Sequence, residues 1–171
     1  VSLQTVSWFN RLRNDESLQI SPKFQRRAVW MEKERSLLMD TILNNLPFPE
    51  VYMQVQTNAD SGEQKHIVVD GQQRITSILM FIDNQFSLPV NADWKGEYFR
   101  DLEPQVKELF WDYKIVVRFL RKTNDDEIRN IFTRLNTNNV VLNDQELRNA
   151  RYTGQFKQLT ERLADNPYFQ S

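Results

Sequence analysis

Hydrophobic residues recur along the chain with two different periods, which predicts a protein built from both helices and strands. Spacings of three and four residues predict helices at 3–12, 32–45, 72–83, 104–111, 124–135, 143–152 and 154–165. Runs rich in β-branched and aromatic residues predict strands at 17–20, 50–57, 65–70 and 113–120. We therefore predict an α+β fold in which helices cover a small mixed sheet.

Two of these strands and the helix that follows them form a continuous unit. The strands at 50–57 and 65–70 are separated by the turn-rich sequence "NADSGEQ", which predicts a hairpin. The second strand runs directly into the helix at 72–83. The apolar face of this helix is predicted to consist of Ile75, Ile78, Leu79 and Ile82.

Three other segments complete the pattern. The helix at 32–45 is predicted to bury a stripe of Leu38, Ile42 and Leu46. The sequence "FQRRAVW" at 24–30 fits neither period and is predicted to be a loop. The aromatic segment 86–101 is interpreted as a loop or a lid, carrying Trp94, Tyr98 and Phe99.

Composition narrows the possible functions. The 171 residues have a net charge of −1, so any affinity for phosphate must come from a local site. The absence of cysteine excludes thiol catalysis and thiolate metal sites, and the single histidine, His66, is interpreted as structural. No apolar run is long enough to span a membrane, and no signal pattern is present, so we expect a cytoplasmic protein. We expect one domain over 1–171, cut from a longer protein because the chain starts at Val1.

The strongest candidate site is the sequence "DGQQR" at 70–74, between the strand and the helix. The start of a helix presents free backbone N–H groups, which form a natural anion site. Gly71 allows a tight turn and a close approach of ligand to the backbone. Arg74 opposes the helix dipole unless an anion such as phosphate compensates it, and Gln72 and Gln73 add neutral donors and acceptors. The alternative is a purely structural role, in which Arg74 pairs with Asp70 and the glutamines are solvated.

Two weaker patches have similar chemistry. In "FQRR", Gln25 and Arg26 precede Arg27, and the alternative to a binding role is a solvated basic loop. In "IFTRLNTNN", Phe132 and Asn136 lie one helical turn apart, and Asn136 either caps its helix or presents its amide to a ligand.

Taken together, these segments resemble a known family. The sequences "FQRRAVW", "LMDTILNNLPFPEVYM", "VVDGQQRITSI" and "IFTRLNTNNVVLNDQELRNA" occur in the order found in the DGQQR-motif family at the N-terminus of GmrSD-type restriction proteins. That family belongs to the ParB/sulfiredoxin-like superfamily. The resemblance spans nearly the whole chain, with one departure: members commonly have proline where this chain has Arg27.

The resemblance implies a nucleotide pocket that hydrolyses a nucleoside triphosphate, in a protein that restricts modified foreign DNA. Carried over by position, the pocket residues are Gln25, Arg26, Asp70, Gly71, Gln72, Gln73, Arg74, Phe132 and Asn136. A nuclease domain of the His-Asn-His type, or a partner nuclease, would lie beyond Ser171.

Our leading hypothesis assigns each residue a role. Arg26 and Arg74 would hold phosphates, and Asp70 would bind Mg²⁺ or orient the attacking water. Gln72 and Gln73 would position water or nucleotide, and Asn136 would complete the wall.

Two alternatives remain open. One is a ParB-like nuclease that uses Asp70 with another acid to hold a metal. The other is a module without catalytic activity, regulated by nucleotide, that binds DNA or a protein partner. In that case the arginines at 118, 121, 129, 134, 148 and 151 form a DNA-facing surface or are scattered solvated charges.

Overall fold

The computed structural model describes residues 1–20 and 30–120, together with 126, 127, 130, 133 and 134. The chain divides into two compact units, Val1–Asp125 and Asp126–Ser171. The five described residues of the second unit are helical, and they fall within the helix predicted for 124–135. The helices predicted for 143–152 and 154–165 lie outside the described residues, and all that follows concerns the first unit.

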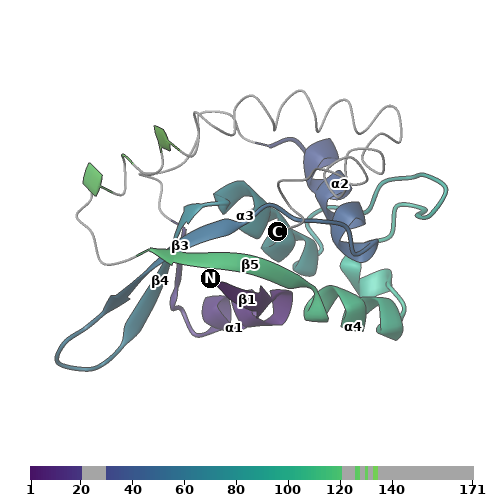
Figure 1. Cartoon of the computed structure of the whole chain (residues 1–171). Helices are drawn as coiled ribbons and strands as arrows, with labels where there is room; N and C mark the ends of the chain where they lie inside the picture. Colours follow the sequence, from purple (N-terminus) through teal and green to yellow (C-terminus); the bar gives the residue numbers. More distant parts are fainter. Residues whose placement is uncertain (21–29, 121–125, 128–129, 131–132, 135–171) are drawn as a thin grey trace, which may run out of the picture. The chain divides into compact units, whose positions relative to one another are not determined.

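A five-stranded mixed sheet forms the centre of the first unit (Figure 1). Its strands are β1 (Ser2–Thr5), β2 (Leu18–Ile20), β3 (Val51–Thr57), β4 (Gln64–Asp70) and β5 (Lys114–Leu120), in the spatial order β1-β5-β3-β4-β2. The outer pair β1–β5 and the hairpin β3–β4 are antiparallel, whereas β3–β5 and β2–β4 are parallel. The predicted α+β class, its mixed sheet and its hairpin are confirmed.

The helices pack against this sheet through one hydrophobic core. They are α1 (Val6–Asn14), α2 (Glu32–Leu43), α3 (Gln72–Ile82) and α4 (Pro104–Asp112), with a short 3₁₀ helix, η2 (Phe99–Asp101). Alternate strand residues enter the core from the sheet, namely Val51, Met53, Val68, Ile115 and Val117. On α3, Ile75, Ile78 and Leu79 are buried as predicted, and Ile82 is partly buried. This packing fixes the start of α3 against the end of β4.

The prediction of a helix over 3–12 is wrong at its beginning. Thr5 is the N-cap of α1, and its Oγ1 accepts a hydrogen bond from the Trp8 N–H at 3.1 Å. The residues before the cap are extended and pair with β5, so Leu3 lies on an edge strand and is 61% exposed. Helical spacing alone did not reveal the cap.

The segment 86–101 is irregular, as predicted, but it is not a lid. Phe86, Leu88 and Phe99 are buried in the core, and the Trp94 Nε1–H donates to Asp40 Oδ1 on α2 at 2.7 Å. Because its aromatic residues supply core volume, the segment is part of the packed structure.

The buried face of α2 also differs from the predicted stripe. Ile42 is buried and Leu38 is partly buried, but Leu46 follows the end of the helix and is 38% exposed. The buried residues of the helix are Arg35, Ser36, Met39 and Ile42. A buried arginine in this position was not predicted.

His66 has a structural position on β4, with its ring 5.5 Å from that of Trp8 in an edge-to-face arrangement. Burial lowers its pKa from the ordinary 6.5. The Nδ1 atom is buried and has no hydrogen-bond partner among the described residues.

These features predict a pH effect on stability. The unfolded chain takes up the His66 proton at a higher pH than the folded chain does. The free energy of unfolding therefore falls as pH drops below about 6.5, until the lowered folded-state pKa is passed. The difference in melting temperature between pH 7.5 and pH 5.5 is expected to be smaller in His66→Gln than in the wild type. An unchanged difference would show that His66 does not contribute to the pH effect.

Candidate functional site

The predicted DGQQR turn connects β4 to α3 through a glycine in a left-handed backbone conformation. Gly71 is the N-cap of α3 and has a φ of 97°, in the left-handed region. A Cβ at this position would lie 3.0 Å from Val51 Cγ2 and 3.3 Å from Arg74 Nη2. The glycine has no capping side chain, and the first helical hydrogen bond runs from the Ile75 N–H to the Gly71 carbonyl. The turn therefore places no side-chain cap on the first N–H groups of the helix.

We expect Gly71→Ala to lower the free energy of unfolding by about 1–2 kcal/mol, because the substitution adds both backbone strain and a steric contact. Gly62→Ala is the control, since Gly62 has a φ of 74° but open space around it. Urea unfolding measures the loss of stability in both variants. Gly62→Ala reports the backbone strain alone, whereas Gly71→Ala reports the strain together with the steric contact. Equal losses would show that the close approach of Val51 is unimportant.

A buried ion pair occupies the first turn of α3. Arg74 Nη2 lies 3.3 Å from Asp70 Oδ2, and the two side chains are 11% and 10% exposed. The guanidinium also lies 5.6 Å from the ring centroid of Phe48. The pairing that the sequence left open is therefore present, and it explains how the helix start tolerates a cation. It also holds the guanidinium beside the first turn of α3, which no side chain caps.

The two glutamines have different surroundings. Gln72 is buried, and its Nε2–H donates to the Val68 carbonyl on β4 at 3.1 Å, so this amide braces the turn. Gln73 is half-buried, and its Oε1 is buried without a hydrogen-bond donor among the described residues. Gln73 therefore has the unused polar capacity that a ligand-binding residue needs.

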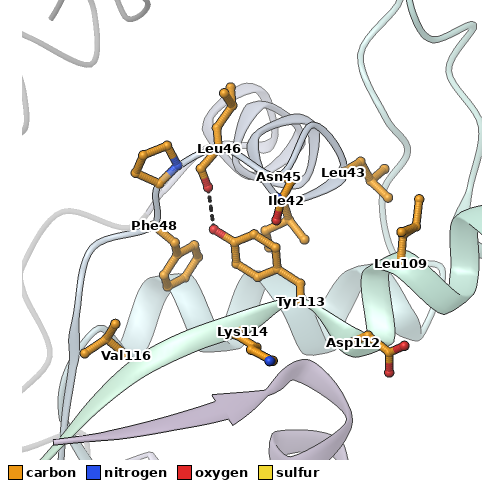
Figure 2. A pocket seen from close by; sticks show the side chains of 11 residues that line it. Ile42, Leu43, Asn45, Leu46, Phe48, Leu109, Asp112, Tyr113, Lys114 and Val116 are labelled. Carbon is orange, nitrogen blue, oxygen red and sulfur yellow. Dashed lines mark hydrogen bonds between the residues drawn. The ribbon is translucent and has the colours of Figure 1, made fainter. Parts of the chain in front are cut away.

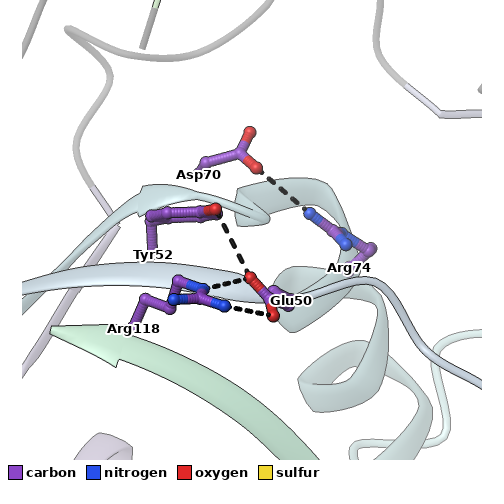
Figure 3. Close-up of polar contacts among 5 residues, drawn as sticks. All are labelled: Glu50, Tyr52, Asp70, Arg74 and Arg118. Atoms are coloured by element: carbon purple, nitrogen blue, oxygen red, sulfur yellow. Dashed lines mark hydrogen bonds and ion pairs between the residues drawn. The ribbon is translucent and has the colours of Figure 1, made fainter. Parts of the chain in front are cut away.

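Strand pairing brings further polar residues to the turn. Tyr52 on β3 lies opposite both Asp70 on β4 and Arg118 on β5. Figure 3 shows Glu50 completing the group, because it accepts hydrogen bonds from the Arg118 guanidinium, one of them at 3.0 Å. The Tyr52 hydroxyl donates to Glu50 at 3.4 Å.

The charges of this group explain its titration. The hydrogen bond from Arg118 lowers the pKa of Glu50, and burial, reinforced by the Glu50 charge, raises the pKa of Tyr52. This arrangement was not predicted, because β5, which carries Arg118, is far from the β3–β4 hairpin in the chain. Of the arginines considered for a DNA-facing surface, Arg118 is paired with Glu50 and Arg134 is exposed.

The structure thus brings together the predicted residues Asp70, Gly71, Gln72, Gln73 and Arg74. The other predicted site residues, Gln25, Arg26, Phe132 and Asn136, lie outside the described residues.

Among the described residues, no three acidic or histidine side chains come together in a group that could hold a metal ion. Mg²⁺ commonly uses only one or two carboxylates and takes its other ligands from water and phosphate. Asp70 fits that pattern as a single carboxylate ligand, although Arg74 already contacts one of its oxygens.

A mainly apolar cavity of about 630 Å³ has none of the residues 70–74 in its lining (Figure 2). It lies between the end of α2 and the α4–β5 connection. The Tyr113 hydroxyl donates to the Leu46 carbonyl at its edge, and burial raises the pKa of Tyr113 to about 12. Its charged lining groups are Asp112 and Lys114, so the cavity does not have the character of a phosphate site.

The fold and the turn define a small α+β domain with a strand–glycine–helix site. Residues 8–153 match the family described as the GmrSD restriction endonuclease N-terminal domain, and the chain belongs to that family. The resemblance inferred from the motifs is therefore confirmed, and the chain is grouped with domains of restriction and phage-defence proteins. No curated protein and no solved structure matches the chain. None of the helices in the described ranges has the length and apolar character required to cross a membrane.

Proposed function

We propose that this domain binds a nucleoside triphosphate at the turn between β4 and α3. The observation that carries the proposal is the buried guanidinium of Arg74, held by Asp70 at a helix start that no side chain caps. Backbone N–H groups at a helix start and a fixed guanidinium together bind phosphate oxygens well. Gln73 supplies a further polar group at the same helix end.

We further propose that the bound triphosphate is hydrolysed. The site contains no cysteine, serine or threonine at 70–74 to form a covalent intermediate, so catalysis would depend on positioning and charge neutralisation. Asp70 would orient the attacking water or contribute one oxygen to Mg²⁺, which would itself neutralise phosphate charge. Arg74 would neutralise charge that develops on the phosphate.

Family membership supports the biological context of this proposal. The domain would act within a restriction protein directed against modified foreign DNA, together with a nuclease domain or a partner nuclease. A metal-dependent nuclease site in this domain is less well supported, because such sites use several clustered acids and the described residues have no such cluster.

Calorimetric titration with the four ribonucleoside triphosphates, with and without Mg²⁺, tests binding. A dissociation constant below about 1 mM for at least one of them is expected, and the absence of any binding would contradict the proposal. Phosphate release, measured on the same samples, tests hydrolysis. Tight binding without release over several hours would instead indicate a module regulated by nucleotide.

A further inference from the structure

Arg35 is a buried cation outside the predicted site. It is the fourth residue of α2 and is 8% exposed. Its Nε–H donates to the Trp30 carbonyl at 3.3 Å, and its Nη1 lies 3.3 Å from Ser77 Oγ and 2.8 Å from Met80 Sδ. No carboxylate of the described residues forms an ion pair with it.

These partners do not balance the charge of the guanidinium. Two of them are neutral oxygens, and the third is a thioether sulfur, which is a weak acceptor. Arginine keeps its charge in proteins, and buried charges are normally paired with an opposite charge. The position is therefore well suited to an anion that the described residues do not supply.

Ser77 and Met80, which Arg35 contacts, lie on the helix that begins at the DGQQR turn. Gln73, Ser77 and Met80 are spaced by four and three residues, so they share one face of α3, and Arg35 packs on that face. Ser77 is fully buried, and its hydroxyl donates to the Gln73 carbonyl at 2.6 Å. We call Arg35, Gln73 and Ser77 the α2–α3 cluster.

The α2–α3 cluster contains both a cation and an unused acceptor. The Gln73 Oε1 is buried and lacks a hydrogen-bond donor among the described residues, and none of their carboxylates forms an ion pair with Arg35. Gln73 is adjacent in sequence to Arg74, and Ser77 lies about one helical turn, or roughly 5.4 Å, further along α3. An elongated polyanion that starts at the first turn of α3 would pass Gln73 before it reaches Arg35.

We propose that Arg35 binds the phosphate group of a polyphosphate ligand that lies farthest from the start of α3. The inference rests on the proposed function, because it assigns a second phosphate contact to the same ligand. Arg74 and the helix start would hold one phosphate, and Arg35 would pair with another through its guanidinium. The α2–α3 cluster would thereby distinguish triphosphates from monophosphates.

Calorimetry with Arg35→Gln tests this assignment. Affinity for the triphosphate that binds the wild type best is expected to fall at least 10-fold, while affinity for its monophosphate stays within about 2-fold. Arg11→Gln is the charge-matched control, because Arg11 is exposed on α1, and it should leave both affinities unchanged. Equal affinity of wild type and Arg35→Gln for the triphosphate would overturn the proposal.

Inorganic tripolyphosphate separates this inference from the proposed function. If the wild type binds tripolyphosphate and Arg35→Gln binds it at least 10-fold more weakly, Arg35 is an anion-binding residue even where nucleotides fail to bind. If the variant binds tripolyphosphate as tightly as the wild type does, the assignment is wrong even where nucleotides bind.

A measurement on the wild type tests the proposal even if the Arg35→Gln variant misfolds. The Nε–H resonance of Arg35, assigned by its loss in Arg35→Lys, is expected to shift when tripolyphosphate is added. A shift at Arg74 without one at Arg35 would overturn the proposal.

Discussion

Replacing Arg74 by glutamine is expected to weaken nucleoside triphosphate binding by about 100-fold, or roughly 3 kcal/mol. The guanidinium is nine-tenths buried and is fixed beside the start of α3, so its contact with phosphate would be shielded from solvent. The variant also leaves Asp70 as a buried carboxylate without this cation, which would repel an incoming phosphate. Calorimetric titration of the variant and the wild type measures the effect.

Arg13→Gln is a matched control for this prediction. Arg13 also forms an ion pair with an aspartate of the α3 region, but with Asp83 at the opposite end of the helix, where Nη1 and Oδ2 are 2.6 Å apart. Its loss should leave nucleotide affinity within about 2-fold. If both variants bind as the wild type does, the helix start is not the phosphate site.

Replacing Phe81 by alanine is expected to lower the free energy of unfolding by about 3–5 kcal/mol, the range found for deletion of a large buried aromatic side chain. Phe81 is fully buried on α3, and its ring centroid lies 5.5 Å from Phe86, 5.7 Å from Phe99 and 5.5 Å from Phe110. It therefore joins α3 to the 86–101 segment and to α4. Urea unfolding measures the loss.

Phe119→Ala is the matched control in residue type, because Phe119 is 38% exposed on β5. We expect it to lose about 1 kcal/mol or less. A loss from Phe81→Ala no greater than that of the control would mean that the aromatic cluster does not hold α3 in place. Such a result would also weaken the argument that packing fixes the site.

The stability and binding predictions are connected through α3. One end of this helix carries Arg74, and the other end carries Phe81. A variant that loosens the aromatic cluster should therefore reduce nucleotide affinity less than it reduces stability, since Arg74 of the ion pair lies about two helical turns from Phe81. Nucleotide affinity and the free energy of unfolding should both be measured on each variant. The comparison shows whether a residue contacts the nucleotide or only holds α3 in place.

Local sequence determined much of this domain. The period of apolar residues located α3 and its core face, because a helix must bury one side. Turn residues between two apolar runs specified the β3–β4 hairpin, because few residue types suit such a loop. The order Asp70-Gly71 between strand and helix specified the turn, because only glycine accepts its backbone conformation without strain.

The tertiary structure decided which side chains meet. Tyr52 lies between Asp70 and Arg118 because β3 pairs with both β4 and β5. The hairpin with β4 was predicted, but no spacing along the chain encodes the pairing of β3 with β5. The extended β1 likewise depends on pairing with β5, which overrides the helical spacing that includes Leu3.

Arg35 is the clearest example of a contact that could not be predicted from the sequence. Charged residues near the start of a helix usually face solvent, and its position in sequence gave no other indication. Its burial follows from the packing of α2 on α3, which places the guanidinium on Ser77 and Met80. Sequence periodicity reports which face of an element is apolar, whereas contacts between distant elements depend on how those faces are packed together.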